Sequence, residues 1–248
     1  MGSLIFFLVA CHILSISGDE IIGGTEVSPH SMPYMAFLKF DITGNTYKRC
    51  GGILISEDVV LTAAHCNGTN MQVILGAHNI ISKENSWQVI KVCKILPRQQ
   101  HNKPGNDIML LKLREKAVLN RYVLPLPINH NGGKVNPGSV CSVAGWGIYK
   151  DYNKDEAPTL RKVDVKVVSA EICSKTFPNI DVKKFICAGD PQEKKYAYNG
   201  DSGGPLFCGM DLQGIVHGGD KPPTGLYTKV SSHAKWIKQT IRTMKCKK

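Results

Sequence analysis

Long hydrophobic runs are scarce in this chain of 248 residues, and the one near its start is short. The apolar stretch 4–11 covers eight residues, whereas a membrane-spanning helix needs about 20. Small residues follow at positions 15, 17 and 18, which is typical of a signal peptidase site, although the stretch lacks a preceding Lys or Arg. We therefore predict a secretory signal at residues 1–18, a secreted product and no membrane span.

Internal repeats, low-complexity tracts and metal-binding patterns are also lacking. Five histidines have no cysteine or carboxylate at metal-ligand spacing, so we predict no metal and no cofactor; they are His30, His78, His101, His130 and His233. The chain contains no nucleic-acid-binding motif, and DNA or RNA is not an expected partner. The length is ample for one or two globular domains with a buried core.

Acidic residues are few compared with basic ones: 20 Asp and Glu face 31 Lys and Arg, for a formal charge of +11. Removal of residues 1–20 takes away Asp19 and Glu20 and raises the charge to about +13, which favours binding to polyanions. At helical spacing near the C-terminus, one arc holds Lys235, Lys238, Arg242 and Lys245, and the opposite arc holds Trp236, Ile237, Ile241 and Met244. This pattern predicts a docked helix at about 233–246, whose cations bind a polyanion or form a solvated surface.

Short apolar segments alternate with turn residues from position 34 onward. Turn residues occur at 43–45 and 56–58, and further apolar segments lie at 71–75 and 108–113. Strict alternation at 163–167 places three valines on one face of a strand. Strands of this length predict an all-β barrel or sandwich, and the Pro- and Gly-rich stretch 124–138 is typical of a linker between two halves.

Three segments indicate nucleophilic catalysis. Ser202 lies in GDSGGP (200–205), a tight turn whose backbone N–H groups can face an oxyanion. A serine hydroxyl needs a histidine base and a carboxylate that orients the base. His65 in LTAAHC (61–66) and Asp107 in NDIMLL (106–111) supply these groups, and the order His, Asp, Ser is that of chymotrypsin.

Together with IIGG (21–24), these segments resemble the trypsin/chymotrypsin family of serine proteases. Within that family, PHSMPYMA (29–36), LGAHNI (75–80) and CSVAGWG (141–147) resemble the granzymes and mast-cell granule proteases, and the likeness covers nearly everything after residue 20. The resemblance implies two six-stranded antiparallel β-barrels of the chymotrypsin type, at about 21–127 and 128–232, followed by a terminal helix. His65 and Asp107 would come from the first barrel and Ser202 from the second.

The resemblance also implies how the protein is activated. Residues 19–20 look like an activation dipeptide, and its removal would free the α-amino group of Ile21. That ammonium would pair with Asp201 and order the loop in which the N–H groups of Gly200 and Ser202 form the oxyanion hole.

Substrate preference follows from the pocket positions of the family. Tyr196, followed by Ala197, stands where a trypsin-type enzyme has an aspartate, and Gly219 and Gly225 occupy the walls. Strict cleavage after Lys or Arg is therefore disfavoured, and we predict small or medium apolar P1 residues such as Leu, Met or Ala.

A second departure lies at His217-Gly218, where the family has serine followed by tryptophan or tyrosine. His217 would contact Asp107 and compete with His65, or donate the hydrogen bond that the serine normally makes. Gly218 removes an aromatic wall of the subsites beyond P1.

Nine cysteines include Cys11 in the predicted signal. The resemblance pairs Cys50 with Cys66, Cys141 with Cys208 and Cys173 with Cys187. Cys93 and Cys246 remain, either as an internal bridge or as the bond of a disulfide-linked dimer. Asn67-Gly68-Thr69 is an N-glycosylation sequon.

Two functions agree with these features. The first is a serine endopeptidase that hydrolyses proteins or peptides and is stored on acidic proteoglycan in a secretory granule. The alternative is a catalytically impaired homologue that acts through cationic binding to microbial or proteoglycan surfaces. The intact His65, Asp107 and Ser202 favour the endopeptidase.

Overall fold

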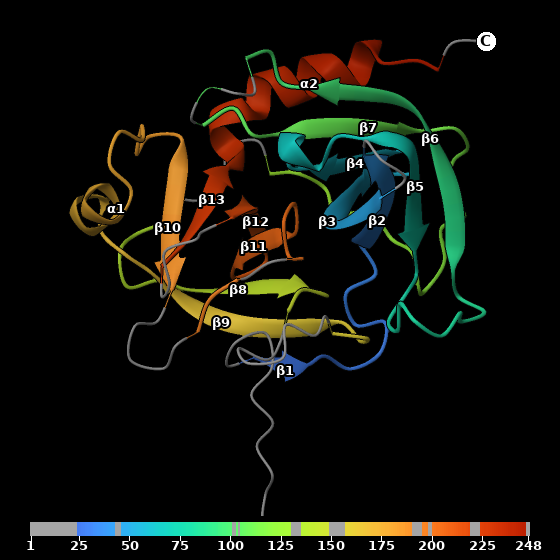
Figure 1. Cartoon of the computed structure of the whole chain (residues 1–248), viewed down its shortest axis with the longest axis horizontal. Helices are drawn as coiled ribbons and strands as arrows, with labels where there is room; N and C mark the ends of the chain where they lie inside the picture. Colours follow the sequence, from blue (N-terminus) through green and yellow to red (C-terminus); the bar gives the residue numbers. More distant parts are fainter. Residues whose placement is uncertain are drawn as a thin grey trace, which may run out of the picture.

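A computed structural model describes residues 24–42, 46–100, 103, 105–129, 135–148, 157–189, 195–197, 200–218 and 224–246. The predicted signal, the activation dipeptide, Ile21, Gly219 and the turn at 43–45 lie outside these ranges. Short strands dominate, and they form two barrels that lie side by side, with the first on the right of Figure 1.

The first barrel closes in the order β2-β3-β4-β7-β6-β5. Its strands are β2 (Met35–Ile42), β3 (Thr46–Ser56), β4 (Val59–Thr62), β5 (Thr69–Leu75), β6 (Gln88–Pro97) and β7 (Met109–Leu113). The predicted turn at 56–58 joins β3 to β4. All four residues of β4 are buried, and four of the five in β7, and their apolar side chains belong to one hydrophobic core.

The second barrel contains the other six long strands: β8 (Val140–Gly145), β9 (Arg161–Val167), β10 (Phe185–Gly189), β11 (Pro205–Cys208), β12 (Asp211–Gly218) and β13 (Gly225–Lys229). Their order is β9-β10-β13-β12-β11-β8, and pairing of β8 with β9 closes the ring. The alternation predicted at 163–167 is confirmed, since Val163, Val165 and Val167 are buried in the barrel core.

Two closed six-stranded antiparallel barrels and a C-terminal helix confirm the predicted fold class. One short strand differs from the expected division of the chain. β1 (Thr25–Glu26) pairs with β9 of the second barrel, opposite Lys162 and Arg161, although its position in the sequence precedes the first barrel.

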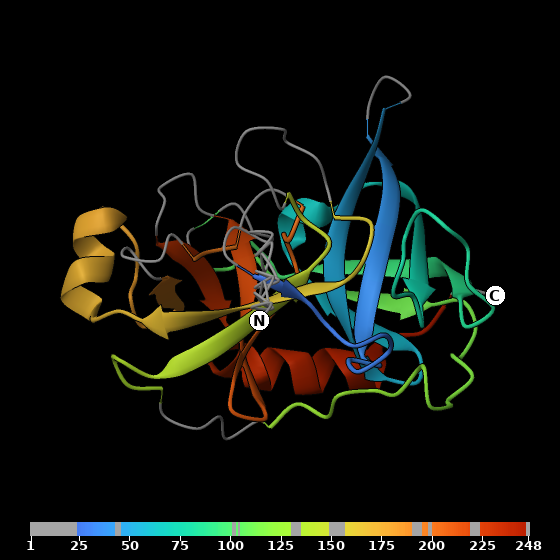
Figure 2. The same cartoon turned by 90° about the horizontal axis from the view of Figure 1, so that it is seen from below.

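The helices lie outside the barrels. α1 (Ala170–Thr176) lies at the far end of the second barrel, whereas α2 (Ala234–Thr243) follows a short 3-10 turn, η2 (Val230–His233), and runs along the first (Figures 1 and 2). Among the described residues, no helix has the length and apolar character needed to cross a membrane.

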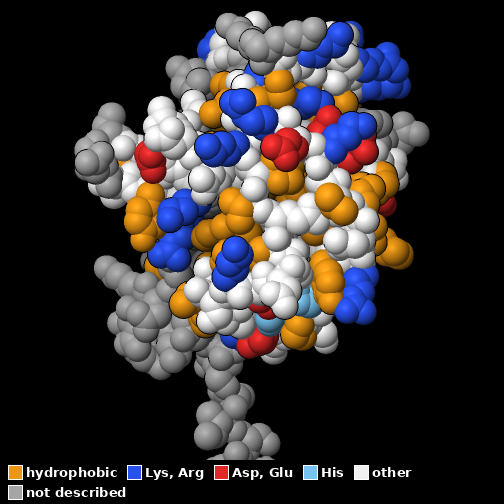
Figure 3. Space-filling model, turned by 90° about the vertical axis from the view of Figure 1, so that its right-hand side faces the viewer, with side chains coloured by type: hydrophobic (Ala, Val, Ile, Leu, Met, Phe, Trp, Pro, Cys, Tyr) orange, Lys and Arg blue, Asp and Glu red, His pale blue; other side chains and the backbone are white. Residues whose placement is uncertain are grey.

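The amphipathic pattern of the C-terminal helix is confirmed. Ile237 and Met244 are buried in the core of the first barrel, and Trp236 and Ile241 pack against it. On the opposite side four cations are exposed: Lys235, Lys238, Arg242 and Lys245. The adjoining face of the molecule also shows more Lys and Arg than Asp and Glu side chains (Figure 3).

Four disulfides connect the fold: Cys50–Cys66, Cys93–Cys246, Cys141–Cys208 and Cys173–Cys187. The bridge from Cys93 to Cys246 lies within one chain and joins β6 to the segment after α2, across 153 residues of sequence. A cross-link between such distant positions restricts the unfolded chain strongly, and it fastens the terminal helix to the first barrel.

Replacing both Cys93 and Cys246 with Ser should lower the free energy of unfolding by about 2–4 kcal/mol, because the unfolded chain gains the freedom that the bridge removes. Denaturant titration of the variant and the parent protein measures this difference. Unchanged stability, or a parent protein with twice the chain mass under non-reducing conditions, would contradict the internal bridge.

Candidate active site

His65 lies in a single 3-10 turn, η1 (Ala64–Cys66), directly after the buried strand β4. The disulfide from Cys66 to Cys50 of β3 fixes this turn against the first barrel. The imidazole is 42% exposed, so one edge of the ring faces solvent while the other faces Asp107.

Asp107 lies just before β7, and its carboxylate is almost fully buried, with 6% of the side chain exposed. Oδ1 accepts a hydrogen bond from the backbone N–H of His65 at 2.8 Å. Oδ2 lies 2.7 Å from Nδ1 of the same residue. These two contacts fix the imidazole orientation that the sequence analysis expected.

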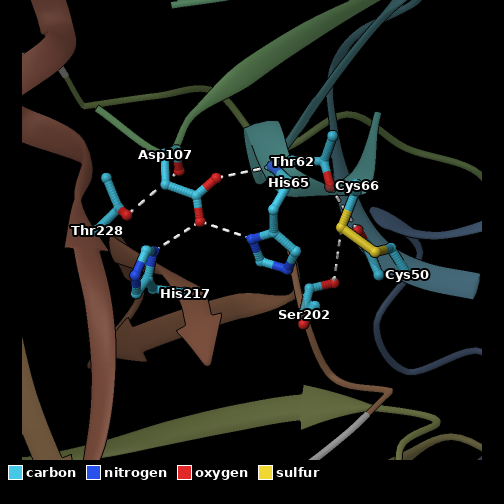
Figure 4. A network of polar contacts seen from close by, with 9 residues as sticks. Cys50, Thr62, His65, Cys66, Asp107, Ser202, His217 and Thr228 are labelled. Atoms are coloured by element: carbon cyan, nitrogen blue, oxygen red, sulfur yellow. Dashed lines mark hydrogen bonds and ion pairs between the residues drawn. A yellow bond between two sulfur atoms is a disulfide. The ribbon is translucent and has the colours of Figure 1, made fainter. Parts of the chain in front are cut away.

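His217 of β12 contacts the same carboxylate from the second barrel. Its Nδ1 lies 2.6 Å from Asp107 Oδ2, so two histidines share one oxygen atom (Figure 4). The His65 and His217 rings are nearly perpendicular, at 89°, with their centroids 6.1 Å apart. The contact between His217 and Asp107 that the sequence analysis considered is therefore present.

Burial alone would raise the pKa of the Asp107 carboxyl, but the hydrogen bonds from His217 and His65 outweigh it and hold the pKa well below its ordinary value. The carboxylate is consequently ionised at neutral pH. It can hold both imidazoles in the tautomer that carries hydrogen on Nδ1, which leaves Nε2 of His65 able to accept a proton.

Ser202 lies on a turn that contacts the first barrel. Its carbonyl oxygen accepts a hydrogen bond from the N–H of Gly51 at 2.8 Å. Gly203 has a φ of 78°, and a Cβ there would lie 2.2 Å from Thr62 Oγ1. Only glycine fits this position, because both the backbone conformation and the space exclude a side chain.

Figure 4 shows Ser202 beside the edge of the His65 ring that points away from Asp107. In the part of the chain that the structure describes, no hydrogen bond joins the Ser202 hydroxyl to His65. Contacts of this kind are often long without substrate and shorten when it binds. The backbone N–H groups of Gly200 and Ser202 likewise donate to no acceptor among the described residues.

Asp201 is completely buried, which is costly for a carboxylate unless it has polar partners. Oδ1 accepts a hydrogen bond from the N–H of Gly147 at 2.9 Å. A Cβ at Gly145 or Gly147 would lie 2.2 or 2.6 Å from the carboxylate, so glycines make the space that it occupies.

Pocket residues of the second barrel are placed in part. Tyr196 and Ala197 are buried, with 5% and 4% exposed. A Cβ at Gly225 would lie 2.9 Å from the hydroxyl of Tyr227, whereas Gly218, at a φ of 118°, has open space around it. Gly219 lies outside the described residues.

Sequence reasoning missed two contacts that hold the Asp107 segment. The hydroxyl of Thr228 donates to the carbonyl oxygen of Asp107 at 3.2 Å. Nε2 of His233 lies 2.8 Å from the carbonyl oxygen of Gly105, two residues before Asp107. Neither residue belongs to a recognisable motif, since each reaches the site only through folding.

His217→Ala should lower the free energy of unfolding by about 1–3 kcal/mol, because the buried Asp107 oxygen loses one charge-assisted hydrogen bond. His217→Ser, which restores a donor, should recover part of this loss. Denaturant unfolding of both variants measures the effect. Equal stability of the Ala variant and the parent would contradict the role assigned to this bond.

Burial lowers the pKa of His233 to about 4, and the positive charges of Arg98 and Lys184 lower it further. The hydrogen bond to Gly105 has the opposite effect and raises the pKa. Between pH 7 and pH 4 the unfolded state therefore binds a proton that the folded state does not, and stability falls as the pH falls.

His233→Gln should reduce the change in unfolding free energy between pH 7 and pH 4 by about 2–3 kcal/mol, because glutamine does not titrate. The measurement is the unfolding free energy at pH 7, 5.5 and 4 for both proteins. Parallel curves would refute the titration of His233 as its cause.

Comparisons with known proteins agree with this geometry. A sequence model described as Trypsin matches residues 21–237. Duodenase-1 of Bos taurus is 44% identical over 248 residues, which cover 98% of both chains. Granzyme B(G,H) of Mus musculus is 46% identical, with 98% of this chain and all of that protein covered.

Cathepsin G of Homo sapiens is 43% identical, with 99% of this chain and 96% of that protein covered. The solved structure of GrC superposes with a TM-score of 0.84 at 41% identity and covers 89% of this chain and 99% of that one. With Asp107, His65 and Ser202 together where the two barrels meet, the chain belongs to the Trypsin family of serine proteases.

Proposed function

We propose that the protein is a secreted endopeptidase that cleaves peptide bonds through Ser202, His65 and Asp107. Ser202 attacks the carbonyl carbon, and His65 Nε2 takes the hydroxyl proton and later gives it to the leaving amine. The proposal rests above all on the two hydrogen bonds from His65 to the buried Asp107 carboxylate, with Ser202 at the opposite edge of the ring.

The N–H groups of Gly200 and Ser202 stabilise the oxyanion in this mechanism. Their lack of acceptors among the described residues supports the assignment, as does the φ of 97° at Gly200, which shapes the turn. Each such donor contributes about 3 kcal/mol to transition-state stabilisation in comparable enzymes.

Activation follows removal of the signal at 1–18 and the dipeptide at 19–20. The new α-ammonium of Ile21 then pairs with Asp201. The complete burial of Asp201 beside Gly145 and Gly147 supports this step, because an ammonium group that enters such a site gains a strong interaction with the carboxylate. The ion pair would specify one conformation of the 200–203 turn rather than add much net stability.

The P1 pocket accepts small or medium apolar side chains such as Leu, Met or Ala. Tyr196 and Ala197 bring no negative charge, and a tyrosine ring at the floor position of the pocket would limit its depth. The burial of Tyr196 supports this role. Gly218 has open space around it, and the predicted wall positions Gly219 and Gly225 bring no charge.

Storage on acidic proteoglycan in a secretory granule is the proposed location before release. The names of the relatives include mast cell proteases and granzymes. The exposed cations of α2 and the net charge of +11 support binding to such a polyanion.

Asn67 is exposed after η1 and is the proposed glycosylation site.

In the trimmed chain, which begins at Ile21, a fluorophosphonate probe should react with Ser202 and leave about one label per molecule. Ser202→Ala should abolish labelling because it removes the attacking oxygen. Mass spectrometry locates the label, and a peptide library then measures the P1 preference.

Acetylation of Ile21 in the trimmed protein is the matched control for activation, and it should abolish labelling. Failure of the folded, trimmed protein to label would refute the endopeptidase and favour cationic binding. A strong preference for P1 Arg would refute the proposed pocket alone.

A further inference from the structure

The candidate site contains one more imidazole than the mechanism uses. Nδ1 of His65 and Nδ1 of His217 both approach Oδ2 of Asp107, at 2.7 and 2.6 Å. Each of the three side chains offers a ligand atom, and these atoms lie within 4.8 Å of one another. The two rings reach the carboxylate from different barrels (Figure 4).

We propose that His65, Asp107 and His217 bind one Zn²⁺ ion, and that the bound ion reversibly stops proteolysis. Two imidazole nitrogens and one carboxylate oxygen form the ligand set of open zinc sites, in which water takes the fourth position. Inhibition rests on the proposed peptidase function, whereas binding of the ion does not.

The geometry needs a rearrangement of the two rings. Zinc–ligand bonds of about 2.0–2.1 Å place neighbouring ligand atoms of a tetrahedron about 3.3 Å apart, so each ring must withdraw from Oδ2 by about 0.6–0.7 Å. The ligand atoms of the two rings, which lie within 4.8 Å of one another, must also come to about this separation. The His65 and His217 side chains are 42% and 34% exposed and have solvent on one side, which permits this movement and gives the ion a path of entry.

The carboxylate, in contrast, is held firmly. Oδ1 of Asp107 keeps its hydrogen bond from the N–H of His65, and its carbonyl oxygen keeps that from Thr228. Outer contacts of this kind orient metal ligands and strengthen binding. Oδ2 is therefore the single oxygen that faces the ion.

Zinc binding removes the catalytic base by moving a proton. In the free site the hydrogen on Nδ1 of each ring lies against Oδ2 of Asp107. The ion takes the lone pair of Nδ1, and the proton that leaves Nδ1 is replaced by one on Nε2 of the same ring, so that the imidazole stays neutral. Nε2 of His65, once protonated, cannot accept the proton of Ser202.

The disulfide beside the site does not compete for the ion. Sγ of Cys50 and Sγ of Cys66 lie near His65, but they are bonded to each other and cannot act as thiolate ligands. His217 therefore determines whether the site holds zinc, because without it this cluster of described residues offers only one imidazole and one carboxylate.

Calorimetric titration with zinc chloride tests binding in the Ser202→Ala protein, which keeps all three ligands and cannot digest itself. We expect about one ion per chain. His217→Ser in the same background should weaken binding by at least about tenfold, since even the loss of an outer contact costs this much. His217→Gln is a second variant in case the serine protein does not fold.

His30→Asn, which removes a histidine outside the cluster, should bind zinc as the parent does. In the active protein, zinc should inhibit turnover, and a chelator should restore turnover. The His217→Ser variant should need at least about tenfold more zinc for the same inhibition. No binding by the parent, or equal binding by the His217 variants, would refute the site. Binding without inhibition would refute the inhibitory role. If the protein had no peptidase activity, the calorimeter would still detect zinc binding, so a failure of the proposed function can be distinguished from a failure of the zinc site.

Discussion

The buried carboxylate of Asp107 is a negative charge placed where the two barrels meet. His65 of the first barrel donates to both of its oxygens, and His217 and Thr228 of the second barrel bond to its carboxylate and its carbonyl oxygen. A buried charge is tolerated only with such partners, so the barrels must dock in the arrangement that supplies them. The same bonds that satisfy the charge orient the base.

Close backbone contact between the barrels places the nucleophile. The N–H of Gly51 in the first barrel binds the carbonyl oxygen of Ser202, and Gly203 leaves no room for a Cβ against Thr62. Backbone contacts of this kind resist displacement better than flexible side chains do. The position of the Ser202 hydroxyl relative to His65 therefore depends on glycines in both barrels.

Much of this arrangement could be predicted from the sequence. The alternation at 163–167, the arcs of the C-terminal helix and the three motifs around His65, Asp107 and Ser202 follow from local spacing and a family resemblance. The pairing of β1 with the second barrel could not be predicted, because two residues carry no periodic signal. The supporting contacts of Thr228 and His233 could not be predicted either, because neither residue belongs to a sequence motif.

His217 shows most clearly what the sequence determines and what only the tertiary structure decides. The sequence by itself determined the residue types, the short strands that form barrels and the presence of a histidine at position 217, where the family resemblance implies a serine. Only the tertiary structure decided that His217 shares Oδ2 of Asp107 with His65, across 110 residues of chain. The reason is geometric: a distance between side chains of two barrels is set by how their cores and backbones dock, which no local pattern encodes.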